Sequence, residues 1–300
     1  MTTVGTGNHA YDVISDWAKV PEGWNAPMAA VTVDSQDRIY GFNRGEHGVI
    51  VFGKDGNYLS DWGETEFAFP HAIYADADDN IWVVDRDAGQ IYKYTTDGKL
   101  LLTIGEKGFR SDTGADNSVF SSNGYGEVTH GGGPFNLPAG IAVAANGDIF
   151  VADGYANCEV HRFSADGKHL KSWGSPGSGP GEFTLPHGAW VDSKGQVLIA
   201  DRENNRIQVF SQDGDFISQW PSEMIGPAVV YIDKDDIAYV AEHNGGMFSI
   251  LTMEGETIER WGGMEFRSCH GVSGDSEGSI YFVQPVEGQQ GRKLVKYVRK

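Results

Sequence analysis

The chain has 300 residues with 40% hydrophobic and 12% aromatic content, enough for a large core, and its 41 glycines favour many short strands joined by tight turns. Its formal net charge of −19 argues against nucleic acid and anionic membrane surfaces as partners, because both are negatively charged. No stretch approaches the roughly 20 apolar residues that span a bilayer, no signal peptide is recognised at the start, and only two cysteines occur, so we expect a cytoplasmic, all-β protein.

The first predicted strand, 11–20, reads YDVISDWAKV and has no partner strand before it. It matches GNYLSDWGET at 56–65, which ends a longer unit at 40–63. That unit contains an apolar strand, a polar loop, an alternating strand, a KDG turn and a final strand ending in WG. Asp-Gly pairs supply the positive φ that tight hairpins need.

The same unit recurs along the chain, and an apolar stretch such as HAIYADADD precedes each copy, which makes four strands per repeat. The copies lie at 40–63, 82–105, 150–174, 198–221 and 239–262. A sixth copy starts at HGVSGDSEG (270–278) but ends before its outermost strand. Segment 11–20 is therefore predicted to pair with the last repeat, which gives a six-bladed β-propeller closed by its N-terminal strand, with 1–300 as a single domain.

The entry to the innermost strand of each blade recurs at intervals in the forties, except for the 68 residues from Pro70 to Pro138. The excess lies at 106–135, whose glycine, serine and asparagine content predicts a long loop inserted between blades 2 and 3. Loops of this length are usually lids or binding loops.

Histidine follows the entry position in alternate blades. The ring of residues after the entry positions reads Met28, His71, Ala139, His187, Ala228 and His270. Alternate blades of a six-fold ring are about 120° apart and their inner strands face the axis, so three imidazoles converge there, as in a three-histidine metal site with an open position. Imidazole binds zinc, iron, copper or nickel, with zinc favoured for chemistry without electron transfer. Four further histidines, His47, His130, His161 and His169, fit no ring and are expected at the surface.

A second ring follows the second strand of each blade and is rich in cationic groups. Its positions hold Arg44, Arg86, Tyr155, Arg202 and His243. In an acidic protein, such a concentration predicts a site for a carboxylate or an oxyanion. Tyr155 is the only phenol of this ring, and beside a metal ion and an arginine it can act as a general base.

Four segments carry a resemblance to a known family: FNRGEH, FPHAIYADADDNIWVVD, VADGYANCEVHRFSADGKHLKSWG and LPHGAWVDSKGQVLIADRENNRIQVF. They resemble the NHL-repeat propeller of the peptidyl-α-hydroxyglycine α-amidating lyases over most of residues 25–290. The resemblance implies axial zinc on His71, His187 and His270, a catalytic tyrosine at Tyr155 and active-site arginines at Arg44 and Arg202. It also implies cleavage of an N-acyl hemiaminal to an amide and glyoxylate.

The chain departs from this family around the third histidine, where it reads Ser268, Cys269, His270, Gly271 in place of Met-Pro-His-Asp. The family's substrate-side methionine is replaced by Ser268, so we expect Arg86, His243 and Ser268 to shape a different substrate pocket. The missing aspartate argues against a structural calcium ion.

These features favour a zinc-dependent carbon–nitrogen lyase acting on a small molecule that bears a carboxylate. Two alternatives remain from the sequence. One is a metal-dependent hydrolase of a small amide or lactone, and the other is a non-enzymatic NHL interaction platform. A calcium-dependent lactonase propeller would need axial acidic and amide ligands, which the histidine ring displaces.

Overall fold

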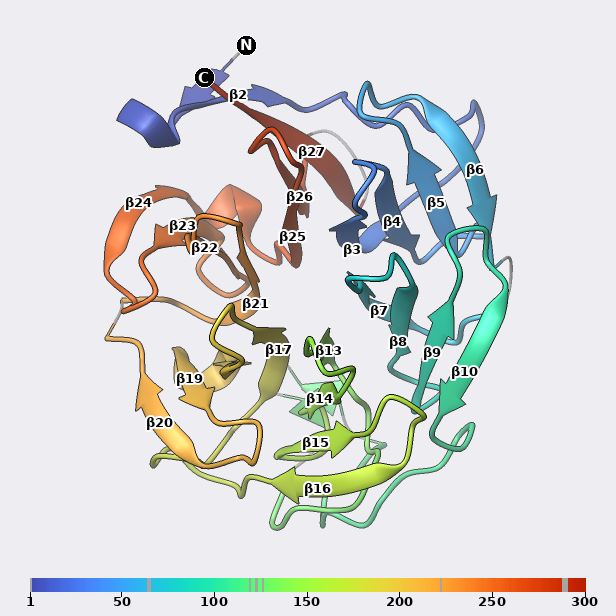
Figure 1. The fold of residues 1–300 in the computed structure, drawn as a ribbon, viewed down its shortest axis with the longest axis vertical. Helices are drawn as coiled ribbons and strands as arrows, with labels where there is room; N and C mark the ends of the chain where they lie inside the picture. The colour runs from blue at the N-terminus through green and yellow to red at the C-terminus, as the bar shows by residue number, and fades with distance from the viewer. Residues whose placement is uncertain are drawn as a thin grey trace.

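The computed structural model describes residues 2–63, 66–118, 120–121, 124–125, 127–221, 223–287 and 291–300. Six antiparallel sheets of four or five strands surround a common axis in chain order, from blue through green to red (Figure 1). This arrangement confirms the predicted six-bladed propeller. Within the described residues the helices are short 3₁₀ turns, Gly7–His9, Arg202–Asn204 and Met264–Phe266, and none is long and apolar enough to cross a membrane.

Each blade is a meander of antiparallel strands that runs outward from the axis. Blade 1 is β3 (Met28–Val33), β4 (Ile39–Asn43), β5 (Val49–Phe52) and β6 (Tyr58–Trp62). Blade 2 is β7 (Pro70–Ala75), β8 (Ile81–Asp85), β9 (Gln90–Tyr94) and β10 (Leu100–Ile104). Blade 3 is β13 (Gly140–Val143), β14 (Ile149–Asp153), β15 (Glu159–Phe163) and β16 (His169–Trp173).

The second half of the ring repeats the pattern. Blade 4 is β17 (Pro186–Val191), β18 (Val197–Asp201), β19 (Arg206–Phe210) and β20 (Phe216–Gln219). Blade 5 is β21 (Pro227–Ile232), β22 (Ala238–Glu242), β23 (Met247–Leu251) and β24 (Thr257–Gly262). Blade 6 is β25 (Gly271–Gly274), β26 (Ile280–Pro285) and β27 (Arg292–Arg299), with β2 (Tyr11–Ile14) and β1 (Thr2–Val4) outside them.

The outer hairpins turn at the glycines that the repeats predicted. Gly56, Gly98, Gly167 and Gly214 have φ between 79° and 84°, in the left-handed region that only glycine enters without cost. The same repeat therefore produces the same hairpin in four blades.

The hydrophobic core is divided among the contacts between neighbouring blades. Blades 1 and 2, for example, pack through Tyr40 and Phe42 of β4 against Ile73 and Val83. Because both faces of each sheet are covered by the adjacent blades, β4, β8 and β14 are buried along their whole lengths. The core therefore fixes the blades relative to one another around the axis.

Ring closure involves both ends of the chain. β2 pairs with β27 in the register Tyr11↔Arg299 to Ile14↔Lys296, and the two termini lie side by side (Figure 1). Trp17, 5% exposed, continues this closure by packing against Tyr281 of blade 6 and Phe52 of blade 1. The predicted closure by the N-terminal segment is confirmed, and β1 adds a fifth strand outside it.

Deletion of residues 1–18 is expected to lower the free energy of unfolding by about 5 kcal/mol or more. It removes the buried Tyr11 and Trp17 side chains and exposes the edge of β27. Deletion of residues 1–3 is the control, because Thr2 and Thr3 are exposed and Val4 remains in place. Equilibrium denaturation measures both, and a chain lacking 1–18 that melts at the full-length temperature would contradict this closure.

The predicted loop 106–135 lies between β10 and β13, and residues 119, 122–123 and 126 of it lie outside the described part of the chain. Within it, β11 (Phe120–Ser121) pairs with β12 (Gly124–Tyr125). The segments on either side return to blade 3, where Thr113 donates its hydroxyl hydrogen to the carbonyl oxygen of Ala156 at 2.6 Å. The described ends of this connection therefore contact the loop that carries Tyr155.

Candidate metal centre and the cavity above it

Three histidines meet on the propeller axis. His71, His187 and His270 are at most 2% exposed, and their ring centroids lie 4.7–4.9 Å apart. One ligand nitrogen from each lies within 4.8 Å of the other two, so these side chains can hold one metal ion. The structure thus brings together the three side chains that sequence spacing placed on alternate blades.

A local irregularity aims two of these histidines at the axis. The pairing of β7 with β8 passes from Pro70 to Ala72, and that of β17 with β18 passes from Pro186 to Gly188, so His71 and His187 each occupy a bulge. A bulged residue is released from the ladder, which lets its side chain leave the strand's alternation.

Buried carboxylates hold the segments that enter these strands. Asp85, at the end of β8, accepts the backbone N–H groups of Ala68 and Phe69 at 2.7 and 2.8 Å, just before His71. Asp201 accepts those of Thr184 and Leu185 in the same way, just before His187. In blades 2 and 4, the carboxylate at the end of the second strand therefore positions the axial histidine of the same blade.

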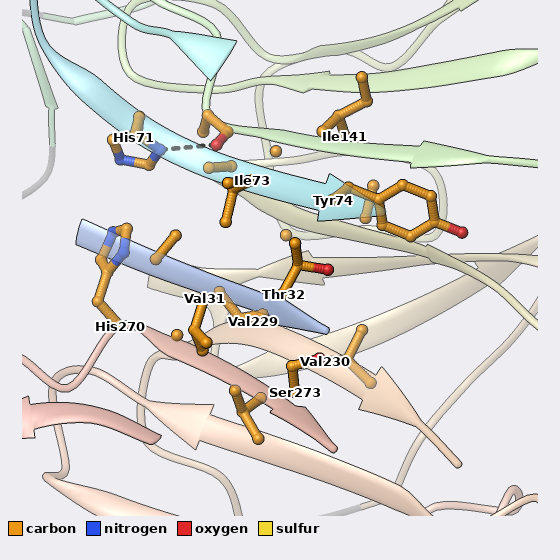
Figure 2. Close-up of a pocket in the computed structure, with 18 of the residues that line it drawn as sticks. Val31, Thr32, His71, Ile73, Tyr74, Ile141, Val229, Val230, His270 and Ser273 are labelled. Atoms are coloured by element: carbon orange, nitrogen blue, oxygen red, sulfur yellow. Dashed lines mark hydrogen bonds between the residues drawn. The ribbon is translucent and has the colours of Figure 1, made fainter. Parts of the chain in front are cut away.

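The histidine tautomers are fixed by the intervening blades. The Nδ1–H groups of His71, His187 and His270 donate to the carbonyl oxygens of Ala139, Ala228 and Ala29 at 2.6–2.8 Å (Figure 2 shows the first). The axial ring thus alternates histidine and alanine. Its blade 1 member is Ala29, and the prediction of Met28 was wrong because the bulge in β3 falls one residue later.

Their Nε2 atoms are left as acceptors that face the axis. Burial, the largest cause, lowers the pKa of each of these three histidines well below its usual value, so the rings are neutral at neutral pH. The Nε2 of His270 is buried without a hydrogen-bond partner among the described residues. Neutral imidazoles that donate through Nδ1 and present Nε2 are the arrangement zinc-binding histidines use, so the residues present fit a zinc ion.

Tyr155 lies against this cluster. Its hydroxyl oxygen is 3.1 Å from Nε2 of His71 and 3.2 Å from Nε2 of His187, and it accepts a hydrogen bond from Nη1 of Arg202 at 3.2 Å. Burial alone would lower the pKa of Arg202, but Tyr155 and Glu203 together raise it. The phenol oxygen therefore contacts two of the histidine nitrogen atoms that face the axis and a permanent positive charge.

The backbone around Tyr155 is braced by the long connection. The N–H of Tyr155 donates to the carbonyl of Leu137 at 3.4 Å, and the N–H of Ala156 donates to that of Asn136 at 3.2 Å. The side chain is 7% exposed and packs with Leu137, Ala139 and Leu185. Its position is thus set by tertiary packing on both sides of the loop.

A cavity of about 510 Å³ lies above the histidines. The predicted residues Arg44, Arg86, Tyr155, Arg202, His243, Ser268 and His270 all line it. Four more lining residues were not singled out from the sequence: Phe69, Asn244, Arg267 and Arg292. The volume is in the range of small-molecule sites.

The positive charges of this cavity are partly desolvated and act on one another. Burial first, and then Arg292 and Arg86, lower the pKa of Arg44 to about 9. Burial also lowers the pKa of Arg292, and burial together with Arg202 and Arg292 lowers that of His243 to about 3. Arg44 therefore remains charged at neutral pH while His243 is neutral, and the cavity favours an anion.

Arg292 was missed because it was read only as part of the last strand. The sequence does contain a signal for it in the residues opposite. In blades 2 to 5 the second strand ends in a buried carboxylate, whereas blade 6 has Gln284 at that place, and Arg292 pairs with Pro285. An arginine without the repeat's usual acidic neighbour is available for another anion.

Below the histidines, the axis narrows to an apolar channel of about 50 Å³. Figure 2 shows His71 and His270 at one end and side chains such as Ile73, Val229 and Val230 farther along. This channel holds a few water molecules at most. A substrate therefore reaches the histidines from the arginine-lined cavity on the other side.

The other histidines divide into two groups. His130 and His169 are exposed and His47 is half-buried, as expected of surface positions. The prediction for His161 was wrong, because it is fully buried and contacts Asp153 through Nε2 and Ser172 through Nδ1. It faces these partners because Ser172 lies directly opposite it in the β15–β16 register. Cys158 and Cys269 are buried free thiols.

Comparisons with known proteins agree with this fold. A family model described as a 6-bladed beta-propeller matches residues 140–245. Peptidyl-alpha-hydroxyglycine alpha-amidating lyase 1 of Drosophila melanogaster is 28% identical over 272 residues, which cover 80% of this chain and 47% of the lyase. The chain thus spans about half the length of that relative.

Two further comparisons concern the repeat and the fold. Human NHL repeat-containing protein 3 is 31% identical over 251 residues, covering 78% of this chain and 67% of the human protein. A gluconolactonase structure from Xanthomonas campestris superposes with a TM-score of 0.69 at 12% identity, over 99% of this chain and 95% of that one, and shows the fold alone. The chain belongs to the NHL-repeat six-bladed β-propellers and, among them, is similar to the peptidyl-α-hydroxyglycine α-amidating lyases.

Proposed function

We propose that the protein is a zinc-dependent carbon–nitrogen lyase that cleaves an N-acyl hemiaminal, a small α-hydroxyglycine-like molecule, into an amide and glyoxylate or another carbonyl product. The observation that carries this proposal is the contact of the Tyr155 hydroxyl with two histidine Nε2 atoms and with Arg202. The similarity to amidating lyases supports the same reaction class.

The metal ion of this proposal would be held by Nε2 of His71, His187 and His270. Three neutral imidazoles leave one coordination position for a substrate oxygen. When bound, the ion would supply a Lewis acid at the substrate hydroxyl. The position after His270 is Gly271, which has no side chain to offer a calcium ion, so calcium has no role in the proposal.

Tyr155 is the proposed base. Its oxygen accepts the hydroxyl proton of the substrate, and the electron pair left on the substrate oxygen forms the second bond of the carbonyl. The C–N bond breaks with its electrons going to nitrogen, and the leaving amide nitrogen takes the proton back from Tyr155. Arg202, which donates to the Tyr155 oxygen, stabilises the phenolate form that this step requires. No water is consumed.

The remaining cavity residues bind and orient the substrate. Arg44 and Arg202 are proposed to hold its carboxylate, while Arg86, His243 and Ser268 shape the cavity around it. Arg44 also donates to the carbonyl of Pro70, next to His71, and its guanidinium lies 4.0 Å from the ring centroid of Phe69. The guanidinium of Arg44, which is proposed to bind the substrate, is thus connected to the histidine cluster through the Pro70 carbonyl.

The decisive experiment incubates zinc-loaded protein with N-acetyl-α-hydroxyglycine in ¹⁸O-water. A lyase releases glyoxylate and acetamide, and the acetamide oxygen carries no label, because the acyl carbon is never attacked. A hydrolase places label in acetate, which would replace the proposal with the hydrolytic alternative. Absence of turnover with this and related carbinolamides would contradict the proposed lyase.

A further inference from the structure

One cavity gathers almost half of the arginines in the chain. Five of the 11 arginines line it, and none of the other described lining residues is acidic. This concentration occurs in a protein whose net charge is −19. Like charges in a confined site repel one another, so such a cluster is maintained at a cost in stability unless anions bind there.

Two of these five arginines form ion pairs with carboxylates, and the other three form none with the described residues. Arg86 pairs with Asp87 and Arg202 with Glu203 through their Nε atoms. In the part of the chain that is described, Arg44, Arg267 and Arg292 have no carboxylate within salt-bridge distance. Arg44 and Arg292 have backbone carbonyls as partners instead, those of Pro70 and Ser268.

Comparison of two blades shows what is unusual about Arg292. Arg206 starts the third strand of blade 4 and pairs with Asp201 at 3.0 Å. The residue that corresponds to it in blade 6 is Lys293, opposite Gln284, and Arg292 lies one position earlier. In blade 6 the residue opposite Arg292 is Pro285, so the guanidinium turns to Ser268 and lines the cavity. Arg292 therefore brings its charge to the cavity with no carboxylate opposite it on the facing strand.

The cationic groups lie on different sides of the axis. Arg202 follows β18 of blade 4 and donates to Tyr155 of blade 3, whereas Arg292 starts β27 of blade 6 and donates to Ser268, in the segment before β25. Blades 3 and 6 lie across the axis from each other (Figure 1). One substrate carboxylate next to the reacting carbon can reach the Tyr155 side. It leaves Arg292 and Arg267 on the blade 6 side for a separate group.

We infer that the cavity takes a substrate with two anionic groups, an α-carboxylate on the Tyr155 side and a second carboxylate or phosphate-like group on the acyl part, bound by Arg292 and Arg267. This substrate class rests on the proposed lyase function and narrows it. A carboxylate and a phosphate-like group are both oxyanions, one planar and one tetrahedral, and guanidinium groups bind either through charge-assisted hydrogen bonds.

Calorimetric titration of zinc-loaded protein with unreactive glycine analogues tests the inference without turnover. N-Succinylglycine, with two carboxylates, should bind about 10- to 100-fold more tightly than N-acetylglycine, with one. N-(Phosphonoacetyl)glycine distinguishes the source of the second anion, because tighter binding than N-succinylglycine assigns a phosphate-like group. Equal affinity of all three analogues would overturn the inference.

Variants locate the second anion site. Arg292→Gln should abolish most of the preference for N-succinylglycine and leave N-acetylglycine binding within about threefold, and Arg267→Gln should have a smaller effect of the same sign. Arg162→Gln removes the same charge from the opposite face, where Arg162 binds Asp148 and Asp213, and should keep the preference. If Arg292→Gln does not fold, Arg292→Lys tests the same loss of the planar donor pair. An unchanged preference in folded Arg292 variants would overturn the assignment.

Measurements of turnover distinguish failure of the dianion inference from failure of the proposed lyase function on which it rests. N-Succinyl-α-hydroxyglycine should exceed N-acetyl-α-hydroxyglycine in kcat/KM by the same factor as the affinities. Equal kcat/KM values with equal affinities would support the lyase and overturn the dianion. Preferential binding of N-succinylglycine without cleavage of either substrate would support the dianion site and overturn the lyase.

Discussion

Replacement of Tyr155 by phenylalanine is expected to lower kcat roughly 10²- to 10⁴-fold, the usual contribution of a positioned proton acceptor. The change removes one oxygen, the atom that lies 3.1 and 3.2 Å from two histidine Nε2 atoms. The ring keeps its packing against Leu137 and Leu185, so the melting temperature should change little.

Steady-state kinetics and metal analysis must be done on the same preparation, because the Tyr155 oxygen contacts the proposed ligand atoms. Loss of kcat with full metal content assigns the proton transfer to Tyr155. Tyr58→Phe is the matched control, since its hydroxyl binds Asp61 at the protein surface, far outside the cavity lining. Undiminished turnover in Tyr155→Phe would remove this residue from the mechanism.

Untagged wild-type protein should contain close to one equivalent of a transition metal ion, and the His71→Ala, His187→Ala, His270→Ala triple variant should contain none. The three Nε2 acceptors converge on one point, and the surrounding carbonyls fix their tautomer. Elemental analysis measures the content. A metal-free wild type that is fully active would contradict the proposal.

A second readout separates metal binding from simple loss of packing. An ion present at 1,000 times its dissociation constant stabilises the fold by about 4 kcal/mol, so chelation should lower the melting temperature of the wild type and leave that of the triple variant unchanged. The control replaces His47, His130 and His169, none of which belongs to the cluster, and should retain the metal. His270→Gln preserves side-chain volume if the alanine variant fails to fold.

The features that depend on local, repeated contacts could be predicted from the sequence. The blades could be predicted because each depends on contacts within about 40 residues, on glycine turns and on alternating apolar positions, all of which repeat along the chain. The three axial histidines could be placed for the same reason, since a ring with known blade order converts sequence interval into angle. The family resemblance added roles for Tyr155, Arg44 and Arg202 that spacing alone left open.

Two predictions made from the sequence were wrong, those for Met28 and His161. Ala29 replaced Met28 in the axial ring because the sequence pattern places Pro27 at the entry of blade 1, whereas in the structure Met28 pairs with Asn43 at the place where Pro70 pairs with Asp85 in blade 2. His161 is buried because its partners, Asp153 and Ser172, come from the neighbouring strands of its own blade. A polar residue in an alternating strand can face either side, and only the pairing register decides which.

The sequence by itself determined the number of blades, the closure by the N-terminal segment and the arrival of three imidazoles at the axis, because these follow from periodicity and strand pairing. Of the closing strand predicted at 11–20, the structure pairs Tyr11–Ile14 with β27. Only the tertiary structure decided that Ala29, Ala139 and Ala228 fix the histidine tautomers, that the Tyr155 oxygen lies against two of the rings, and that Arg267 and Arg292 join the cavity. These features depend on where side chains from different blades point after the ring has closed, and that direction is set by packing between segments up to 241 residues apart, the separation of Ala29 and His270.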